Sequence, residues 1–415
     1  MNQIKNNNTI MTSNQCLGLL DKYGSPLYAF DEQGFIDNYQ HLCTAFRNEY
    51  KNYNPGYSYK TNYTPHICKL IKGLGGYAEV VSDMELYVAL QIGYEHKDII
   101  YNGPSKGEMM ENHLLNGGIS NIDNEAEAHR VLVLAKEHPE KDFKVGIRVN
   151  TDIGAGFISR FGIAVGSETM DRVVNLIKAQ PNLHLVGLHM HVSRARYLSA
   201  WQKRIDNILE AADRYIDGVP EYIDLGSGMF ADMEDYLKNQ FTIEVPSYVE
   251  YAKVVAGTMA KHYEQTERKP MLITEPGTTV VSRYLSLIST VKAFKEINGR
   301  NIAVMDCDIH NAGETAMMMK VPFTHVTCGE GFESKAPIDL TGFTCLEQDT
   351  LFKDFPEPVK VGDVIQFRNV GGYSVVYKPP FIQPNCAMIA VKEDGSVEEI
   401  KRRETFEDIF LTYKF

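Results

Sequence analysis

A lysine at the end of a short aromatic run is the first residue of this sequence that could do covalent chemistry. The letters GYSYKTN at residues 56–62 predict a β-strand that ends at Lys60, and residues 65–74 have helical spacing directly after it. Barrel enzymes keep catalytic groups at the carboxyl ends of strands that open βα units. A lone loop lysine is more often an exposed charge, so the rest of the chain has to decide between the two interpretations.

Seven further strands are predicted after this one, and polar or glycine residues end them. The eight strands lie at residues 57–60, 77–81, 99–102, 119–123, 143–149, 185–192, 222–225 and 271–275, with helical spacing between most of them. Their ends carry Lys60, Glu79, Asn102, Asp123, Arg148, His191, the turn Gly226-Ser227-Gly228, and Glu275. Eight strands that alternate with helices predict a closed (β/α)8 barrel, with these side chains at one mouth.

The pattern changes after Pro276. Short alternating runs such as 363–367 and 387–391, separated by turn signals, predict a β-rich domain of the Greek-key or sandwich type at 281–415. We therefore expect a polar segment and helix at 1–25, a barrel domain at 26–280, and this β domain at 281–415. The strand predicted at 27–30 is outside the barrel count, which makes the β domain its candidate partner.

Composition narrows the class of protein. The chain has 415 residues, 44% of them hydrophobic, and a net charge of -12 without a basic cluster, which argues against nucleic acid as a partner. No apolar run approaches the ~20 residues that cross a bilayer, and residues 1–14 are polar, unlike a signal peptide. Seven cysteines without a CxxC pair indicate a reducing compartment. We expect a cytoplasmic protein without a membrane partner.

Three of the strand ends have more than one chemical interpretation. The glycine turn at 226–228 could offer backbone amides to a phosphate, or be an ordinary tight turn. His189 and His191 would point to the same side of a strand, where they could hold a metal, or one could pack and the other stack on a flat cofactor. No further ligand pattern such as HExxH is present, so we predict no metal. Glu275, before a proline-glycine turn, could face a cofactor or form a salt bridge.

One cofactor uses a lysine, a phosphate cradle, a flat-faced histidine and a carboxylate together. Pyridoxal phosphate forms a Schiff base with a lysine amine, and backbone amides can hold its phosphate. Its ring nitrogen needs a carboxylate partner that keeps it protonated, so that the ring withdraws electrons from the substrate carbanion. Pyridoxal 5'-phosphate is therefore the predicted cofactor.

The sequence also resembles the barrel-fold pyridoxal-phosphate decarboxylases, which include diaminopimelate, ornithine and arginine decarboxylases and are related by fold to alanine racemase. The resemblance runs from about residue 25 to the end. It rests on YKTN at 59–62, the segment 76–85, RFGI at 160–163, HMH at 189–191, GSG at 226–228, EPG at 275–277, CLEQD at 345–349 and GY at 372–373. Glu79 departs from the pattern, since an aspartate is usual there.

The resemblance implies a role for each matched residue. Lys60 would form the Schiff base, His191 would stack on the pyridine ring, and Glu275 would face the ring nitrogen. Cys345 would return a proton to the carbanion from the other subunit of a head-to-tail homodimer. A buried, unreactive side chain is the other interpretation of this cysteine. The implied cofactor-binding set is Lys60, Glu79, Arg148, His191, Gly226, Ser227, Gly228, Glu275, Gly277 and Tyr373.

The expected substrate side of the site departs from the family. Members that act on diaminopimelate have an arginine where this chain has Thr278 and a glutamate where it has Leu346, and GETAMMM at 313–319 replaces an arginine-containing segment. The distal carboxylate of a substrate needs a paired guanidinium, so these changes argue against diaminopimelate. Arg194 could replace the lost contact or be a surface arginine. The predicted substrate-side residues are Arg194, Thr278, Leu346, Glu347 and Asp349.

The sequence therefore predicts a pyridoxal-phosphate decarboxylase of an amino acid or an amino-acid conjugate, such as a siderophore or secondary-metabolite intermediate. The alternatives are a decarboxylase of diaminopimelate or another basic amino acid, an amino-acid racemase, a pyridoxal-phosphate carrier without activity, and a metal-dependent barrel hydrolase. The motif at 345–349 favours decarboxylation over racemisation, and release of carbon dioxide would separate these two reactions.

Overall fold

The computed structural model describes residues 11–331 and 333–415, so most of the polar segment predicted at 1–14 lies outside the described residues. The chain divides into two compact units. The barrel unit comprises residues 39–230 and 243–279. The sheet unit comprises the described residues up to 38, together with 231–242 and 280–415.

The barrel unit is built on eight parallel strands, in the order β2, β3, β4, β5, β6, β8, β9, β10. Backbone hydrogen bonds also join the two ends of this order, from Gly56 N to Thr274 O (2.8 Å) and from Leu272 N to Asn52 O (2.9 Å), so the sheet closes on itself. The predicted (β/α)8 barrel is confirmed. The strands are β2 (Gly56–Ser58), β3 (Tyr77–Val80), β4 (Ile99–Tyr101), β5 (Ile119–Ile122), β6 (Phe143–Asn150), β8 (Leu183–His189), β9 (Tyr222–Asp224) and β10 (Met271–Ile273), and a short β7 (Ile163–Ala164) pairs with β6.

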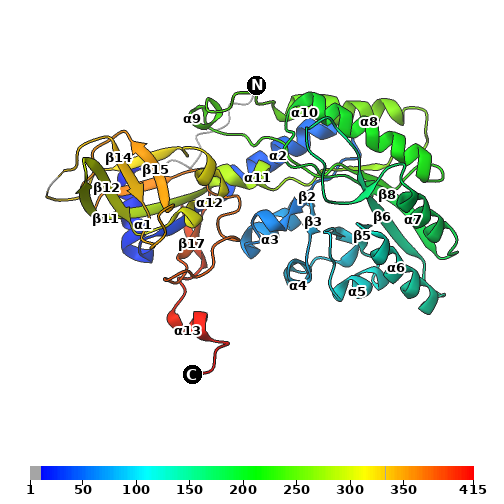
Figure 1. Cartoon of the computed structure of the whole chain (residues 1–415), viewed down its shortest axis with the longest axis horizontal. Helices are drawn as coiled ribbons and strands as arrows, with labels where there is room; N and C mark the ends of the chain where they lie inside the picture. Colours follow the sequence, from blue (N-terminus) through cyan, green and yellow to red (C-terminus); the bar gives the residue numbers. More distant parts are fainter. Residues whose placement is uncertain (1–10, 332) are drawn as a thin grey trace. The chain divides into compact units, whose positions relative to one another are not determined.

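Helices cover the outside of the barrel strands (Figure 1). Four of them begin after a polar residue whose side chain accepts a backbone amide of the first turn, namely Ser82, Asn124, Ser167 and Ser247. The helices are α3 (Pro65–Gly73), α4 (Asp83–Ile92), α5 (Met109–Leu115), α6 (Glu125–Glu137), α7 (Glu168–Lys178), α8 (Leu198–Tyr215) and α10 (Tyr248–His262), with 3-10 turns η1 (Tyr59–Thr61) and η2 (His96–Asp98).

Seven of the eight barrel strands end earlier than the sequence patterns predicted, and two of these ends bear on the site. The ladder between β2 and β3 stops at the pair Ser58 and Glu79, and the chain then turns, so Lys60 lies in η1 rather than on a strand. The strand β8 ends at His189, and His191 lies in the following loop. Only the first histidine therefore belongs to a strand, but both face one carboxylate, since His189 Nε2 lies 3.3 Å from Glu275 Oε1 and His191 Nδ1 lies 3.9 Å from Glu275 Oε2.

The sheet unit holds a mixed sheet in the order β15, β14, β12, β11, β1, β17, β18, and β16 pairs with both β11 and β13. The early strand β1 lies between β11, which is antiparallel to it, and β17, which is parallel. Leu27, Ile288 and Ile389 belong to one buried cluster in this unit. The strands are β1 (Leu27–Asp31), β11 (Leu285–Ile297), β12 (Arg300–Met305), β13 (Phe323–Val326), β14 (Ile338–Thr341), β15 (Thr350–Phe355), β16 (Val364–Phe367), β17 (Ala387–Val391) and β18 (Val397–Lys401).

Several helices were not predicted from the sequence. The helix α12 begins after Asp308, which accepts the amide of Asn311, and it is interrupted at Gly313, whose φ of 81° breaks the helical period. An 18-residue α2 was also missed. The helices not yet given are α1 (Ser13–Tyr23), which lies in the helical segment predicted at 1–25, α2 (Glu32–Glu49), α9 (Asp235–Lys238), α11 (Thr278–Val281), α12 (Ile309–Met318) and α13 (Phe406–Phe410). The segment η3 (Ser282–Tyr284) is a 3-10 turn.

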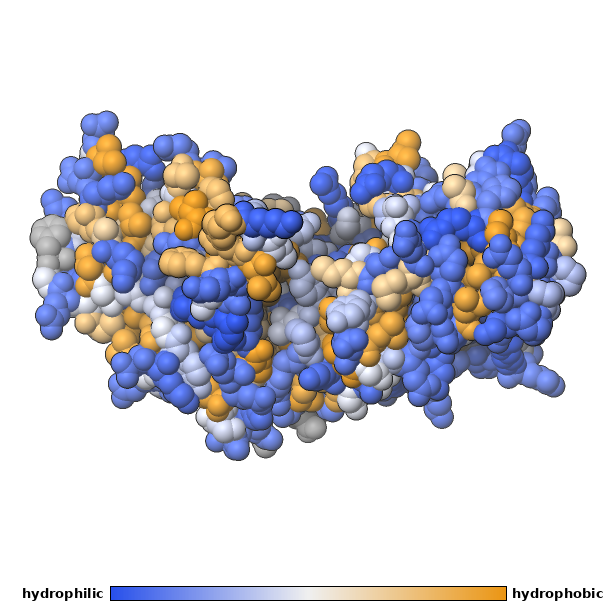
Figure 2. All heavy atoms as spheres, turned by 90° about the horizontal axis from the view of Figure 1, so that it is seen from below, coloured by the Kyte–Doolittle hydropathy of each residue, from blue (hydrophilic) through white to orange (hydrophobic). Residues whose placement is uncertain are grey.

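Hydrophilic residues predominate on the face shown in Figure 2, and hydrophobic residues lie among them. Within the part of the chain that the structure describes, we find no helix with the length and apolar character needed to cross a membrane.

Candidate active site

Lys60 is held at the barrel mouth by a buried carboxylate. Its Nζ donates to Glu79 Oε2 at 2.6 Å, and the same oxygen accepts Ser58 Oγ at 2.5 Å. The side chain of Glu79 is 1% exposed, whereas that of Lys60 is 29% exposed. The longer glutamate, in place of the usual aspartate, thus reaches the amine from β3 and leaves it accessible from outside the barrel.

Glu275 follows β10 and is surrounded by donors. Asn102 Nδ2 donates to its Oε1 at 2.5 Å, and His189 Nε2 lies 3.3 Å from the same oxygen. Burial alone would raise the pKa of Glu275, but the neighbouring His189 and Lys60 outweigh it and hold the pKa below its usual range. A carboxylate that stays charged in a buried place is suited to keep a proton on a ring nitrogen of a ligand.

A second carboxyl group, Asp224, lies beside Glu275. Burial and the charge of Glu275 raise its pKa well above the usual range, so Asp224 is the neutral member of the pair. Side-chain ligand atoms of His189, Asp224 and Glu275 all lie within 4.8 Å of one another, and all three residues are buried. Asp224 Oδ1 accepts the amide of Gly226 at 2.9 Å, which ties this pair to the glycine turn.

The glycine turn after β9 packs directly on His191. Gly226 and Gly228 have φ of 59° and 104°, which favour glycine. A Cβ on Gly226 would lie 2.7 Å from the ring of His191, so no larger residue fits there. The amide of Ser227 donates to His191 Nδ1 at 3.1 Å, which makes this nitrogen the acceptor. Burial and Lys60 both lower the pKa of His191, so its ring is neutral.

Sequence reasoning missed Arg204, a fully buried arginine beneath the glycine turn. Its guanidinium, on α8, donates to three backbone carbonyls: Ser227 O (2.9 Å), Val192 O (2.5 Å) and Ala195 O (2.6 Å). Among the described residues, no carboxylate lies within ion-pair distance of it. Burial lowers its pKa to about 9, because a desolvated charge without a counter-ion is unfavourable. An anion bound at the glycine turn would supply that counter-charge.

The sequence contains a signal for Arg204 in hindsight. Trp201, Ile205 and Ile208 are the buried apolar face of α8, and Arg204 lies on this face by helical spacing. A charged residue at a core position of an amphipathic helix is rarely buried without a specific partner.

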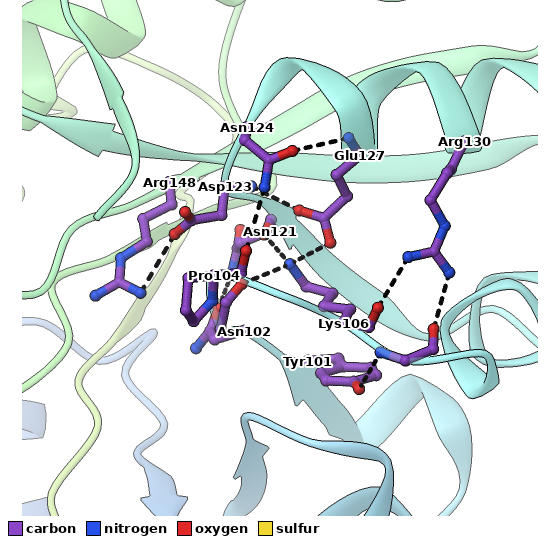
Figure 3. Close-up of polar contacts among 12 residues, drawn as sticks. Tyr101, Asn102, Pro104, Lys106, Asn121, Asp123, Asn124, Glu127, Arg130 and Arg148 are labelled. Carbon is purple, nitrogen blue, oxygen red and sulfur yellow. Dashed lines mark hydrogen bonds and ion pairs between the residues drawn. The ribbon is translucent and has the colours of Figure 1, made fainter. Parts of the chain in front are cut away.

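A third group of buried charges joins the ends of β4, β5 and β6 (Figure 3). Lys106 Nζ lies 2.7 Å from Glu127 Oε1, and its side chain has no exposed surface. Glu127 Oε2 accepts the amide of Asp123 at 2.7 Å, and Asp123 Oδ1 lies 3.4 Å from Arg148. The guanidinium of Arg148 is 4.6 Å from the ring centre of Phe161. Arg148 and Asp123 therefore anchor the RFGI loop, and Lys106 was not singled out from the sequence.

The other predicted site residues are placed as follows. Thr278 begins α11, and Arg194 is exposed in the loop before α8. Gly277 has no room for a side chain, since its Cβ would lie 2.1 Å from Thr61 Oγ1. Cys345, Leu346, Glu347, Asp349 and Tyr373 all belong to the sheet unit, whereas Lys60, Glu79, Arg148, His191, Gly226, Ser227, Gly228 and Glu275 belong to the barrel unit.

Cys345 is exposed in the turn between β14 and β15, and Asp349 shapes this turn. The carboxylate of Asp349 is buried and accepts Ile309 N at 2.8 Å, Thr344 N at 3.1 Å and Thr344 Oγ1 at 2.6 Å. Its oxygens are thus occupied by donors of its own unit. This geometry supports a positioning role for Asp349 rather than a direct contact with a substrate.

Comparisons with known proteins agree with the division into a barrel and a sheet domain. The family description "Pyridoxal-dependent decarboxylase, pyridoxal binding domain" matches residues 37–282, and "Pyridoxal-dependent decarboxylase, C-terminal sheet domain" matches residues 278–371. The chain belongs to the pyridoxal-dependent decarboxylases. Members of this family are amino-acid carboxy-lyases that use pyridoxal phosphate, so the predicted cofactor and reaction class are confirmed.

Individual relatives cover nearly the whole chain. The diaminopimelate decarboxylase of Methanothermobacter thermautotrophicus is 27% identical over 410 residues, which are 94% of this chain and 92% of that protein. The enzyme of the same name from Neisseria meningitidis serogroup B is 27% identical over 94% of this chain and 93% of its own. The crystal structure of M. jannaschii diaminopimelate decarboxylase with L-lysine has a TM-score of 0.83 at 24% identity, covering 96% of this chain and 94% of that one, which shows the shared fold.

The residues of the barrel mouth fit pyridoxal phosphate. The buried guanidinium of Arg204 next to the glycine turn suits a phosphate, and the charged carboxylate of Glu275 suits a protonated ring nitrogen. When bound, the cofactor supplies the electron sink that stabilises negative charge on the substrate carbon.

We expect an Arg204→Met variant to bind pyridoxal phosphate ~10-fold or more weakly, because one charge-assisted contribution to phosphate binding is lost. Binding of pyridoxal, which has no phosphate, should fall much less. Titration of the cofactor-free variant with both compounds measures the ratio. Arg47→Met is the control, since Arg47 also donates to a backbone carbonyl, Tyr53 O, at 3.1 Å. An equal loss for both compounds would show that Arg204 acts only on local folding.

Proposed function

We propose that this protein decarboxylates an amino acid, or an amino-acid conjugate with a free α-amino carboxylate, other than diaminopimelate. The observation that supports this proposal is the buried set at the barrel mouth, in which Glu79 holds the amine of Lys60 and Asn102 holds the charged carboxylate of Glu275. An amine that can carry the cofactor and a charged carboxylate that can keep its ring nitrogen protonated are the two groups that this chemistry requires.

Each group has a separate task in the proposed mechanism. Lys60 is the amine that would hold the cofactor. Glu275 would keep a proton on the nitrogen of the cofactor ring, and the neutral imidazole of His191 would pack against that ring. The α-carbon loses one carbon dioxide. Cys345 then supplies the one proton that takes the place of the carboxylate on this carbon.

The substrate side supports a substrate other than diaminopimelate. Thr278, Leu346 and the segment 313–319 lack the arginine and glutamate side chains expected by resemblance for that substrate. Arg194 is exposed, and no ion pair of its guanidinium is found within residues 11–331 and 333–415. It is therefore free to bind an acidic group at the far end of a larger substrate, which agrees with a siderophore or another secondary-metabolite intermediate.

Diaminopimelate or another basic amino acid is the second candidate substrate. It is favoured by the relatives, since those reported above are named diaminopimelate decarboxylases and match 94% of this chain. A racemase is the third, and it would need a second proton-transferring group opposite Lys60, usually a tyrosine of the second domain. We further propose that the protein is a cytoplasmic head-to-tail homodimer in which each site takes Cys345 from one chain and Lys60 from the other.

A substrate panel tests the proposal. The holoprotein is incubated with diaminopimelate, lysine, ornithine, arginine and acidic conjugates of diamino acids, and released carbon dioxide and the amine product are measured by mass spectrometry. We expect release from a conjugate and at least ~10-fold slower release from diaminopimelate, as the loss of a guanidinium contact implies. Fastest release from diaminopimelate would overturn the substrate assignment, and inversion of the α-carbon without carbon dioxide would indicate a racemase.

A further inference from the structure

A chain of buried side chains crosses the inside of the barrel to reach both functional carboxylates. Tyr222 OH bonds to Asn121 Oδ1 at 2.6 Å, and Asn121 Nδ2 bonds to Asn102 Oδ1 at 2.8 Å. Asn102 Nδ2 then donates to Glu79 Oε1 at 3.1 Å and to Glu275 Oε1 at 2.5 Å. We call Tyr222, Asn121 and Asn102 the amide relay; none of the three is more than 4% exposed.

The direction of every hydrogen bond in the amide relay is set by its carboxylate end. An ionised carboxylate can only accept, so the amide nitrogen of Asn102 must face Glu79 and Glu275. Its carbonyl oxygen must then accept from the amide nitrogen of Asn121, whose own oxygen accepts from Tyr222. Burial raises the pKa of Tyr222 well above the usual range, so its hydroxyl keeps the proton that it donates.

The backbone around the relay is also fixed. Lys106 Nζ donates to the carbonyl oxygen of Asn121 at 2.7 Å, and Figure 3 shows Asn102 and Asn121 beside this lysine. The bond from Lys106 fixes the main chain at Asn121, and rotation of the Asn121 side chain would break its bonds to Tyr222 and Asn102. An unpaired amide in this dry interior would be unfavourable, which keeps the relay in one arrangement.

We infer that Asn102 is a positioning residue that donates one hydrogen bond to each of two carboxylates, the partner of Lys60 and the partner of the cofactor ring, and so fixes both in place at the barrel mouth. Asn121 and Tyr222 hold its amide in the orientation that this requires. The inference rests on the proposed roles of Lys60 and Glu275. Two carboxylates at short range in a poorly solvated site repel one another, and one of them takes up a proton unless donors compensate.

Removal of the relay should change a spectroscopic property as well as activity. We expect Asn102→Leu to lower the pKa of the Schiff base between Lys60 and the cofactor by about one unit, because Glu79 loses the hydrogen bond that orients it and then stabilises the protonated Schiff base less. The turnover rate should fall by ~10- to 100-fold while the cofactor stays bound. The other ionisable groups around the pair are unchanged in this variant; they are Glu85, Arg148, His189, His191 and Asp224.

The measurement is a pH titration of the visible absorbance of the holoprotein, alongside its thermal unfolding. Tyr222→Phe removes a single hydroxyl and should shift the titration in the same direction by a smaller amount. Tyr94→Phe is the matched control, since Tyr94 OH donates to Gly76 O at 3.0 Å away from the relay. It should lose stability without a shift. If Asn102→Leu does not fold, the comparison of the two tyrosine variants decides the result.

An unchanged titration in Asn102→Leu and Tyr222→Phe, with reduced stability, would overturn the inference and leave the relay as packing. This outcome is distinct from failure of the proposed function. If Lys60→Ala retained the absorbance of a lysine-bound cofactor, the roles assigned to Lys60 would be wrong whatever the Asn102 variants show.

Discussion

A Lys60→Ala variant is expected to lose the visible absorbance of the lysine-bound cofactor and at least ~10³-fold in turnover rate, because the amine that forms the covalent link is absent. Borohydride reduction of the wild-type holoprotein, followed by peptide mass spectrometry, should place the cofactor on the peptide that contains Lys60. The side chain of Lys60 is 29% exposed, and its Nζ donates to Glu79 Oε2 at 2.6 Å.

Two controls sharpen this experiment. Lys60→Arg keeps a cation beside the buried Glu79 but cannot form a Schiff base, so it separates loss of the covalent link from exposure of an unpaired carboxylate. Lys106 is the other lysine at the strand ends, and it is enclosed by Glu127 and two backbone carbonyls. A reduced cofactor found on Lys106, or full absorbance in Lys60→Ala, would contradict the assignment.

Mixed dimers of two inactive variants are expected to recover activity. Cys345→Ala should turn over ~10²- to 10⁴-fold more slowly, since it removes a proton donor. In a hybrid with Lys60→Ala, one of the two sites receives an intact Lys60 and an intact Cys345 if the site is shared between chains. Purified hybrids should then regain about half of the wild-type activity, and a random mixture roughly a quarter.

The hybrids are obtained by co-expression of the two variants with different affinity tags. The control is a hybrid of Lys60→Ala with wild type, which must keep one working site under either arrangement. No recovery in the Lys60→Ala and Cys345→Ala hybrid would show that both residues act from the same chain, or that Cys345 is not the proton donor. Either result would overturn the shared-site proposal.

The sequence by itself determined the architecture of the barrel. Eight short strands alternate with amphipathic helices, and capping residues such as Ser82 and Asn124 mark where the helices begin. The spacing of apolar residues in each strand and helix depends on local hydrogen bonding and on one apolar face, and both are encoded within a few residues. The same locality explains why Lys60, Glu275 and the glycine turn could be singled out, since each follows a strand.

Local patterns were weaker where tertiary contacts decide the structure. The helix α12 is interrupted by Gly313, and the ends of β2 and β8 depend on where the ladder to a neighbouring strand stops. Alternation alone does not give the last residue of a strand to within one or two positions. Differences of this size decided whether Lys60 and His191 lie on strands or in the turns that follow.

Only the tertiary structure showed which polar residues are buried together. Asn102 follows a strand that looks ordinary in the sequence, Asn121 lies within another, and Tyr222 is an aromatic strand residue. The closed barrel brings them into one chain of hydrogen bonds that ends at Glu79 and Glu275. Such partnerships join residues up to 173 positions apart, so no local pattern could reveal them.

The sequence also does not show which groups surround the buried charge of Arg204. Its place on the apolar face of α8 follows from helical spacing, but its partners are the carbonyls of loops that the barrel folds against it. The types of residue and their order along the chain therefore determined the family and the chemistry. Folding determined the electrostatics, because burial and distance set which carboxyl group is charged, which is neutral, and which cation lacks a counter-ion.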